Sequence, residues 1–150
     1  EAENGVFVLT ALYGVITVVT AVVGGIWSDR IGRRKPFVIG SGLIAAVALL
    51  LLGFASTWPM AVVGAVILAI GFGTYTAVDF AMITQVLPAA VDRAKDLGVI
   101  NIANALPQVL APGVAALVLS LDLGYSGLYL VAAFFSVLGS VLVNRIRSLD

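Results

Sequence analysis

Long runs of hydrophobic residues, separated by short polar segments, dominate the pattern of this 150-residue chain. Five runs are long enough to cross about 30 Å of hydrocarbon as helices, which takes roughly 20 residues each. Their predicted bounds are 6–26, 36–54, 58–87, 97–121 and 125–143. The pattern therefore predicts an all-α, polytopic membrane bundle of five transmembrane helices. The third run is long enough to tilt in the bilayer or to extend beyond it.

The composition supports this fold class, because 61% of the residues are hydrophobic and only 11% are charged. The mean hydropathy is +1.15, whereas about a quarter of the residues in a soluble domain are charged. Too few polar residues remain to cover a soluble surface, so membrane lipid is an expected partner. The chain has no cysteine and no histidine, which excludes disulfides, thiol nucleophiles and histidine metal ligands.

The basic residues predict the orientation of the bundle. With five alternating spans, all eight of them fall on one side of the membrane: Arg30, Arg33, Arg34, Lys35, Arg93, Lys95, Arg145 and Arg147. The segments on the other side contain no Lys or Arg. Cytoplasmic loops carry the excess of Lys and Arg, so we expect a multi-pass protein of an inner, or cell, membrane. Its N-terminal end should lie outside and its C-terminal end in the cytoplasm.

The segment after the first run has the most informative pattern, Gly25-Ile-Trp-Ser-Asp29-Arg30-Ile-Gly32-Arg33-Arg34. A glycine at position 25 lets a neighbouring helix approach closely. Gly32 is expected to adopt a positive φ and turn the chain between two antiparallel helices. Asp29 can accept hydrogen bonds at a helix start or pair with an arginine. The arginines can bind carboxylates or anionic lipid headgroups.

This pattern resembles the signature loop of the major facilitator superfamily, which follows the second helix and, in weaker form, the eighth. The resemblance implies a cytoplasmic gate motif made of Gly25, Asp29, Arg30, Gly32, Arg33 and Arg34. It also implies a secondary active transporter that works by alternating access between two helical bundles. Asp29 would then find its partner in the other, N-terminal half of the protein.

The helices match the C-terminal half of such a transporter better than the N-terminal half. In the N-terminal half, the helix two places after the first helix of the loop usually carries an arginine before a glycine-rich stretch. Residues 68–73 read Leu-Ala-Ile-Gly-Phe-Gly, with no arginine in the membrane. The resemblance therefore implies helices 8 to 12 in family order. We expect the first helix of this half, and the whole N-terminal half, to lie upstream of residue 1.

The third run carries Asp79, the one ionisable residue well inside a predicted span. Such residues are costly in a bilayer and usually face a cavity or a partner. Helical spacing places Tyr75 and Thr76 on the same face, so these three residues are candidates for a substrate or proton pathway. A structural carboxylate that pairs with the basic residues is the alternative. An opposite row of small residues predicts a helix-packing surface: Ala61, Ala65, Ala69, Gly73, Ala77 and Ala81.

The fourth run carries a polar stripe made of Asn101, Asn104 and Gln108. Two prolines, Pro107 and Pro112, interrupt its hydrogen-bond ladder. Bent helices with polar inner faces line the cavities of secondary transporters, so the stripe is predicted to line the same pathway. Amides that only form hydrogen bonds between helices would give the same sequence pattern.

Other classes of protein fit less well. An intramembrane aspartyl protease needs a second buried carboxylate, and the chain lacks phosphate-binding loops and metal-ligand clusters. We therefore expect no enzyme, no cofactor and no nucleic-acid partner. The alternative of a non-transporting receptor or membrane subunit, built on the same helices, stays open. The substrate is a small molecule, either a sugar-like solute or an exported drug, and neither symport nor antiport is favoured.

Overall fold

The computed structural model describes residues 2–86 and 93–145, and this part of the chain forms five long helices. Their bounds are α1 (Ala2–Ile31), α2 (Lys35–Gly53), α3 (Trp58–Val86), α4 (Arg93–Ser120) and α5 (Gly124–Asn144). All five are long and apolar enough to span a membrane. The predicted spans agree with these helices to within a few residues. Leu87, the predicted end of the third span, lies outside the described residues.

Short turns reverse the chain between α1 and α2, between α2 and α3, and between α4 and α5. Gly32 has a φ of +70°, as its sequence context predicts, and its N–H donates to the carbonyl of Ser28 at 3.0 Å. Pro36 lies in the first turn of α2, where its missing N–H has no helical acceptor to lose. At the other end of the bundle, Gly124 has a φ of +59° and opens α5. These local conformations produce an up-and-down bundle.

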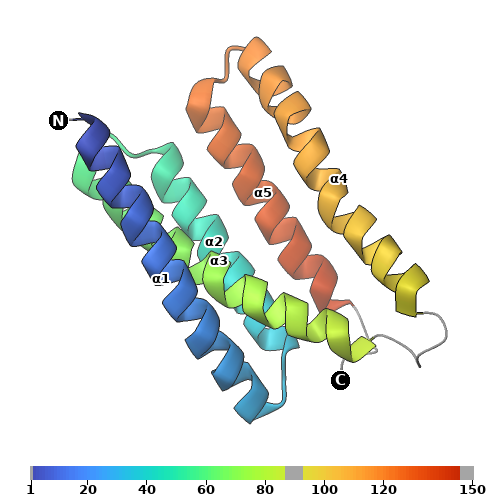
Figure 1. Cartoon of the computed structure of the whole chain (residues 1–150). Coiled ribbons are helices and arrows are strands. Elements are labelled where there is room, and N and C mark those ends of the chain that lie inside the picture. The colour runs from blue at the N-terminus through green and yellow to red at the C-terminus, as the bar shows by residue number, and fades with distance from the viewer. Residues whose placement is uncertain (1, 87–92, 146–150) are drawn as a thin grey trace.

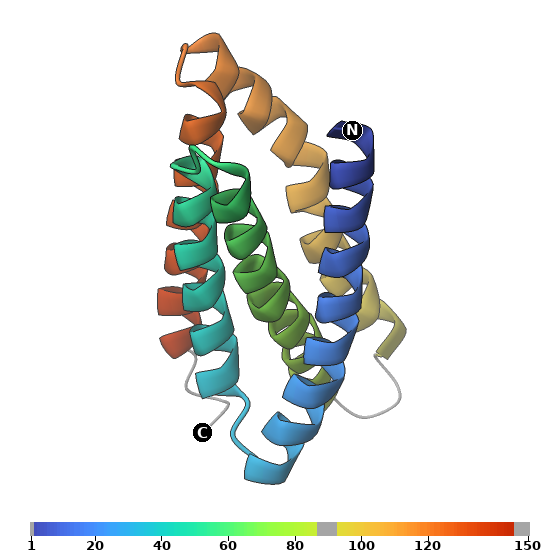
Figure 2. The ribbon, with the colours of Figure 1, turned by 90° about the vertical axis from the view of Figure 1, so that its left-hand side faces the viewer.

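The helices do not pack against one another in the order in which they follow along the chain. Helix α3 packs against both α1 and α2, α2 packs against α5, and α4 makes its main contact with α5. Figure 1 shows α1 and α4 at opposite ends of this arrangement. In Figure 2, where α1 is nearest the viewer, α2 and α5 lie together along one side of the bundle. Helix α4 is therefore the least covered of the five.

Small residues make the closest helix contacts. A Cβ added to Gly73 of α3 would lie 3.1 Å from the carbonyl carbon of Thr17 on α1. Ala69 on the same row is fully buried, and the hydroxyl of Thr20 donates to its carbonyl at 3.3 Å. The predicted row of small residues on α3 is thus confirmed as a packing surface, and the structure identifies α1 as its partner.

The burial pattern is that of a membrane protein. Among the residues whose burial is described, the buried polar ones are Ser28, Ser41 and Ser140, while large apolar side chains such as Phe7 and Phe134 are exposed. In a bilayer there is no hydrophobic force between helices, so small and hydroxyl residues gather where helices meet. The exposed apolar side chains are of the kind that lipid or further membrane helices cover. The all-α membrane bundle predicted from the sequence is therefore confirmed.

Candidate functional site

The described basic residues lie at one end of the bundle. The ends of α1, α3 and α5 and the starts of α2 and α4 meet there, at the lower end in Figure 1. The described members of the set are Arg30, Arg33, Arg34, Lys35, Arg93, Lys95 and Arg145. Arg147 lies outside the described residues. This arrangement agrees with the one-sided distribution expected from five alternating spans.

Arg34 is the centre of the gate motif. One guanidinium nitrogen, Nη2, lies 2.7 Å from Oδ1 of Asp29 on α1. The other, Nη1, donates to the backbone carbonyl of Ala81 on α3. One side chain in the loop before α2 therefore ties the ends of α1 and α3 together. Pairing with an arginine is one of the roles expected for Asp29, and the structure shows it with Arg34. A partner in the N-terminal half stays a prediction.

Gly25 of the gate motif and its neighbour Gly24 differ in how closely α3 approaches them. A Cβ added to Gly25 would lie 3.7 Å from the Cβ of Ala77, which is ordinary contact. A Cβ added to Gly24 would lie 3.2 Å from the Cα of Thr74, which is much tighter. Within this chain the tighter of the two approaches is therefore at position 24, one residue before the position singled out in the motif. Gly24 provides it, because its side of α1 faces α3 directly.

The two other arginines of the motif, Arg30 and Arg33, are not part of this ion pair. Arg30, in the last turn of α1, is exposed. Arg33 is also exposed and, with Lys35, lines a cavity of about 570 Å³ that reaches Asn144 at the end of α5. The motif thus separates into a pairing residue, Arg34, and cations that remain open to solvent or lipid.

The polar face of α3 borders a groove between α3 and α5, with α2 as its floor. This groove has a volume of about 330 Å³, and Phe72 and Tyr75 line it on the α3 side. Asp79 is one helical turn from Tyr75 and is half-buried. The hydroxyl of Thr76 donates to the carbonyl of Phe72 at 2.7 Å, so it is satisfied within its own helix. The hydroxyl of Tyr75 and the carboxylate of Asp79 are therefore the two groups at this edge that a ligand could bind.

The polar stripe on α4 is exposed, as is every residue from 101 to 114. The amide of Gln108 donates to the carbonyl of Asn104 at 3.3 Å, along the same helix. No hydrogen bond joins this stripe to the polar face of α3 within the described part of the chain. The structure thus presents the six predicted residues on two separate helices, without bringing the two sets together. In the described residues, no group of acidic side chains is placed to hold a metal ion.

Sequence reasoning missed the α1 side of the main helix contact. Thr17, Thr20, Gly24 and Ser28 recur at intervals of three or four residues, so they lie on one face of α1. Ser28 is fully buried, and its hydroxyl donates to the carbonyl of Gly25 at 3.0 Å. The signal was available, since hydroxyl and glycine residues at helical spacing are typical of membrane helix contacts.

Comparisons with known proteins agree with this geometry. A myo-inositol transporter, 3C, of Cryptococcus neoformans var. grubii is 29% identical over 125 residues, which cover 83% of this chain. The match covers 21% of that relative, so the chain spans about a fifth of its length. No solved structure matches. The family profile described as Major Facilitator Superfamily matches residues 3–148. This chain, a multi-pass membrane bundle, therefore belongs to the major facilitator superfamily.

Proposed function

We propose that the protein is a secondary active transporter that moves a small polar solute across the membrane by alternating access. The observation that carries this proposal is the polar edge of α3. Tyr75 lines the groove between α3 and α5, and half-buried Asp79 follows one turn later. Ionisable groups at such depth in a membrane helix are costly, and they persist where they face a ligand, an ion or water.

The exposed stripe on α4 supports the same proposal. Asn101, Asn104 and Gln108 present amide groups that lipid cannot satisfy, because hydrocarbon offers no hydrogen-bond partner. We propose that this stripe and the polar edge of α3 line one solute pathway. Its remaining wall would come from the other helices of the transporter, which include the N-terminal half of the same protein.

The chemistry of these groups favours a neutral, polyhydroxylated solute. Amides, a phenol and a carboxylate can each donate to or accept from hydroxyl groups, and no arginine or lysine lies among them. The similarity to a transporter named for myo-inositol supports this class over a hydrophobic drug. A sugar or a cyclic polyol is therefore the proposed substrate.

Asp79 is the proposed proton carrier. It is a half-buried carboxylate, and in the described structure no cation pairs with it. A group of this kind can bind a proton in one conformation and release it in the other. Proton-coupled accumulation would then require Asp79, while solute movement down its own gradient would not.

We further propose that the ion pair between Asp29 and Arg34 belongs to one conformation of the transporter. Rocking of the two bundles would separate the ends of α1 and α3, or would offer Asp29 a different partner. The positive-inside rule places this gate on the cytoplasmic side, with the N-terminal end of α1 outside.

Flux measurements test the proposed function. The complete protein is reconstituted in proteoliposomes, and the uptake of labelled myo-inositol, hexoses and a cationic drug is followed with and without a proton gradient. Saturable uptake of a polyol or sugar, absent from empty liposomes, is the expected result. Binding of a solute without any flux would instead support the receptor or subunit alternative. Flux of the drug alone would overturn the proposed substrate class.

A further inference from the structure

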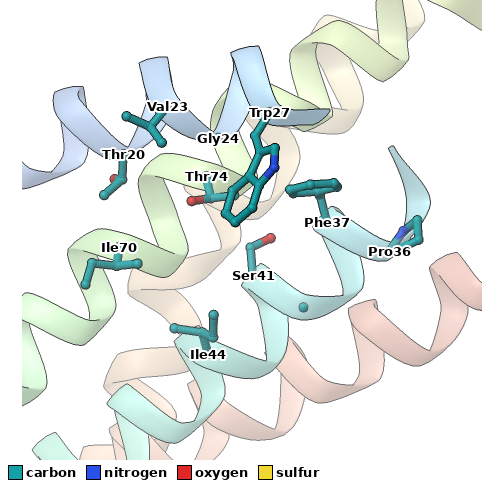
Figure 3. A pocket seen from close by; sticks show the side chains of 11 residues that line it. Thr20, Val23, Gly24, Trp27, Pro36, Phe37, Ser41, Ile44, Ile70 and Thr74 are labelled. Atoms are coloured by element: carbon teal, nitrogen blue, oxygen red, sulfur yellow. The ribbon is translucent and has the colours of Figure 1, made fainter. Parts of the chain in front are cut away.

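The contact between α1 and α3 is closest at two glycines. A Cβ added to Gly24 of α1 would lie 3.2 Å from the Cα of Thr74, and Figure 3 shows these two residues next to each other. One turn earlier on α1, the hydroxyl of Thr20 lies directly against Gly73 of α3. Gly24 and Gly73 are both buried, so the two helices form this contact by themselves, whatever other segments cover the bundle.

Thr20 has one hydroxyl proton and three carbonyl oxygens within reach. Two of these oxygens belong to its own helix, that of Ile16 at 2.8 Å and that of Thr17 at 3.2 Å. The third is the carbonyl of Ala69 on α3, at 3.3 Å. Because a hydroxyl donates only one proton, the link to α3 is the longest of three shared bonds. If α1 moved away from α3, the proton of Thr20 would stay bonded to Ile16.

Thr17, on the same face of α1, has a hydroxyl in the opposite situation. Its hydroxyl oxygen is buried and has no hydrogen-bond partner within the described part of the chain. The hydroxyls of Thr10, Thr20 and Thr76 each donate to the carbonyl four residues before them. A helical threonine divides between two rotamers because its hydroxyl can make this bond. With α1 packed on α3, Thr17 instead leaves a hydrogen bond unmade, which costs free energy.

Arg34 acts against this cost at the basic end of the same contact. It binds Asp29 of α1 at 2.7 Å and also donates to the carbonyl of Ala81 on α3. The two helices are therefore clamped at one end, while an unbonded hydroxyl disfavours their contact further along. A clamp and an opposing cost at one interface are the terms that a two-state element requires.

We propose that the contact between α1 and α3 has a closed and an open arrangement, and that Thr17 favours the open one. In the closed arrangement, which this structure shows, Arg34 clamps α1 to α3 and the hydroxyl of Thr17 is unbonded. In the open arrangement the clamp is released, Thr17 donates to the carbonyl of Tyr13, and Thr20 keeps its bond to Ile16. This switch rests on the proposed function, since alternating access requires two conformations, and it names the residues that set their balance.

Thiol labelling of the complete protein in detergent, without solute, tests the switch in a cysteine-free background. Ser28 is fully buried on the face of α1 that meets α3, so Ser28→Cys should react with N-ethylmaleimide only in the open arrangement. Arg34→Gln should raise the labelling rate, because the clamp is lost. Thr17→Val should lower the rate about tenfold, as expected when one unmade buried hydrogen bond is removed from the closed arrangement. An unchanged rate in either variant would overturn the proposal.

Two matched controls separate the switch from a general change in stability. Thr10→Val removes an exposed hydroxyl of α1 that is bonded to the carbonyl of Val6, so it should leave the labelling of Ser28→Cys unchanged. Ala48→Cys, at a fully buried position of α2, should react at one slow rate in every background. If Thr10→Val acted like Thr17→Val, or if both cysteines changed in parallel, the whole bundle would be responding and the switch would be wrong.

A disulfide between the two helices connects the switch to transport. A Cβ added to Gly25 would lie 3.7 Å from the Cβ of Ala77, a separation that a disulfide can bridge. Oxidation of the protein with Gly25→Cys and Ala77→Cys should hold the contact closed and stop solute exchange, and reduction should restore it. Exchange that continues with the disulfide formed would overturn the proposal. Absence of flux in every form, with the labelling results as expected, would count against the proposed function and not against the switch.

Discussion

Arg34 and Asp29 form an ion pair of 2.7 Å whose two members are very unequally buried: the arginine side chain is 18% exposed and the aspartate 59%. The arginine is covered because it reaches across to the carbonyl of Ala81 on α3, while the carboxylate stays at the surface. An exposed ion pair is worth only about 0.2–1 kcal/mol. Because Arg34 also contacts α3, the loss of Arg34 should lower stability more than the loss of Asp29.

A double-mutant cycle tests this inequality. We expect Arg34→Gln to lower the thermal midpoint of the detergent-solubilised protein more than Asp29→Asn does, because only Arg34 also binds α3. In the Arg34→Gln background, Asp29→Asn should have almost no further effect, since its partner is already gone. Equal losses from the two single variants would show that the contact with Ala81 contributes nothing.

The contact between α1 and α3 predicts a strict size limit at Gly73. Gly73→Ala places a methyl group against the backbone of Thr17, which cannot move aside as a side chain can. We expect a loss of about 1–3 kcal/mol, as for other overpacked sites. Thermal unfolding measures it, with Gly14→Ala as the control. Gly14 is open, so its substitution should be neutral or slightly stabilising. A Gly73→Ala protein as stable as the control would contradict the packing.

The orientation of the bundle predicts a labelling pattern. Thr57, in the turn between α2 and α3, and Lys95, near the start of α4, are exposed at opposite ends of the bundle. In a cysteine-free background, a membrane-impermeant thiol reagent added to intact cells should label Thr57→Cys. It should label Lys95→Cys only after the membrane is opened. The reverse pattern would mean that the basic end faces outward.

Asp79 predicts a separation of coupling from transport. Asp79→Asn should abolish accumulation of the solute under a proton gradient, because an amide cannot carry the proton. Exchange of labelled for unlabelled solute, which needs no net proton movement, should survive. Thr10→Val, on α1, is the control, since the hydroxyl of Thr10 is bound to the carbonyl of Val6 within its own helix. Full gradient-driven accumulation in Asp79→Asn would assign the coupling to another group.

The sequence was sufficient to predict the five-helix architecture and part of the gate motif. Length and hydropathy predict the five helices, because a bilayer requires long apolar runs. The positive φ of Gly32 could be predicted because a sharp reversal next to a helix end favours glycine. The row of small residues on α3 could be identified as a packing surface, although spacing along one helix does not show which helix lies opposite.

The contacts between distant segments could not be predicted. The bond from Arg34 to Ala81 joins residues 47 positions apart, and nothing in either local pattern indicates it. Gly24 and Gly25 are adjacent and identical, so only the rotation of α1 against α3 decides which of them allows the close approach.

The most direct test of the central claim asks whether the polar face of α3 lines a path for solute. In a cysteine-free background of the complete protein, Thr76→Cys is treated with a water-soluble thiol reagent from each side of the membrane. Ala48→Cys, at a fully buried position of α2, is the control. The proposed function predicts that Thr76→Cys reacts from both sides, that substrate slows the reaction, and that Ala48→Cys stays unreactive. An active protein in which Thr76→Cys reacts from neither side would contradict it.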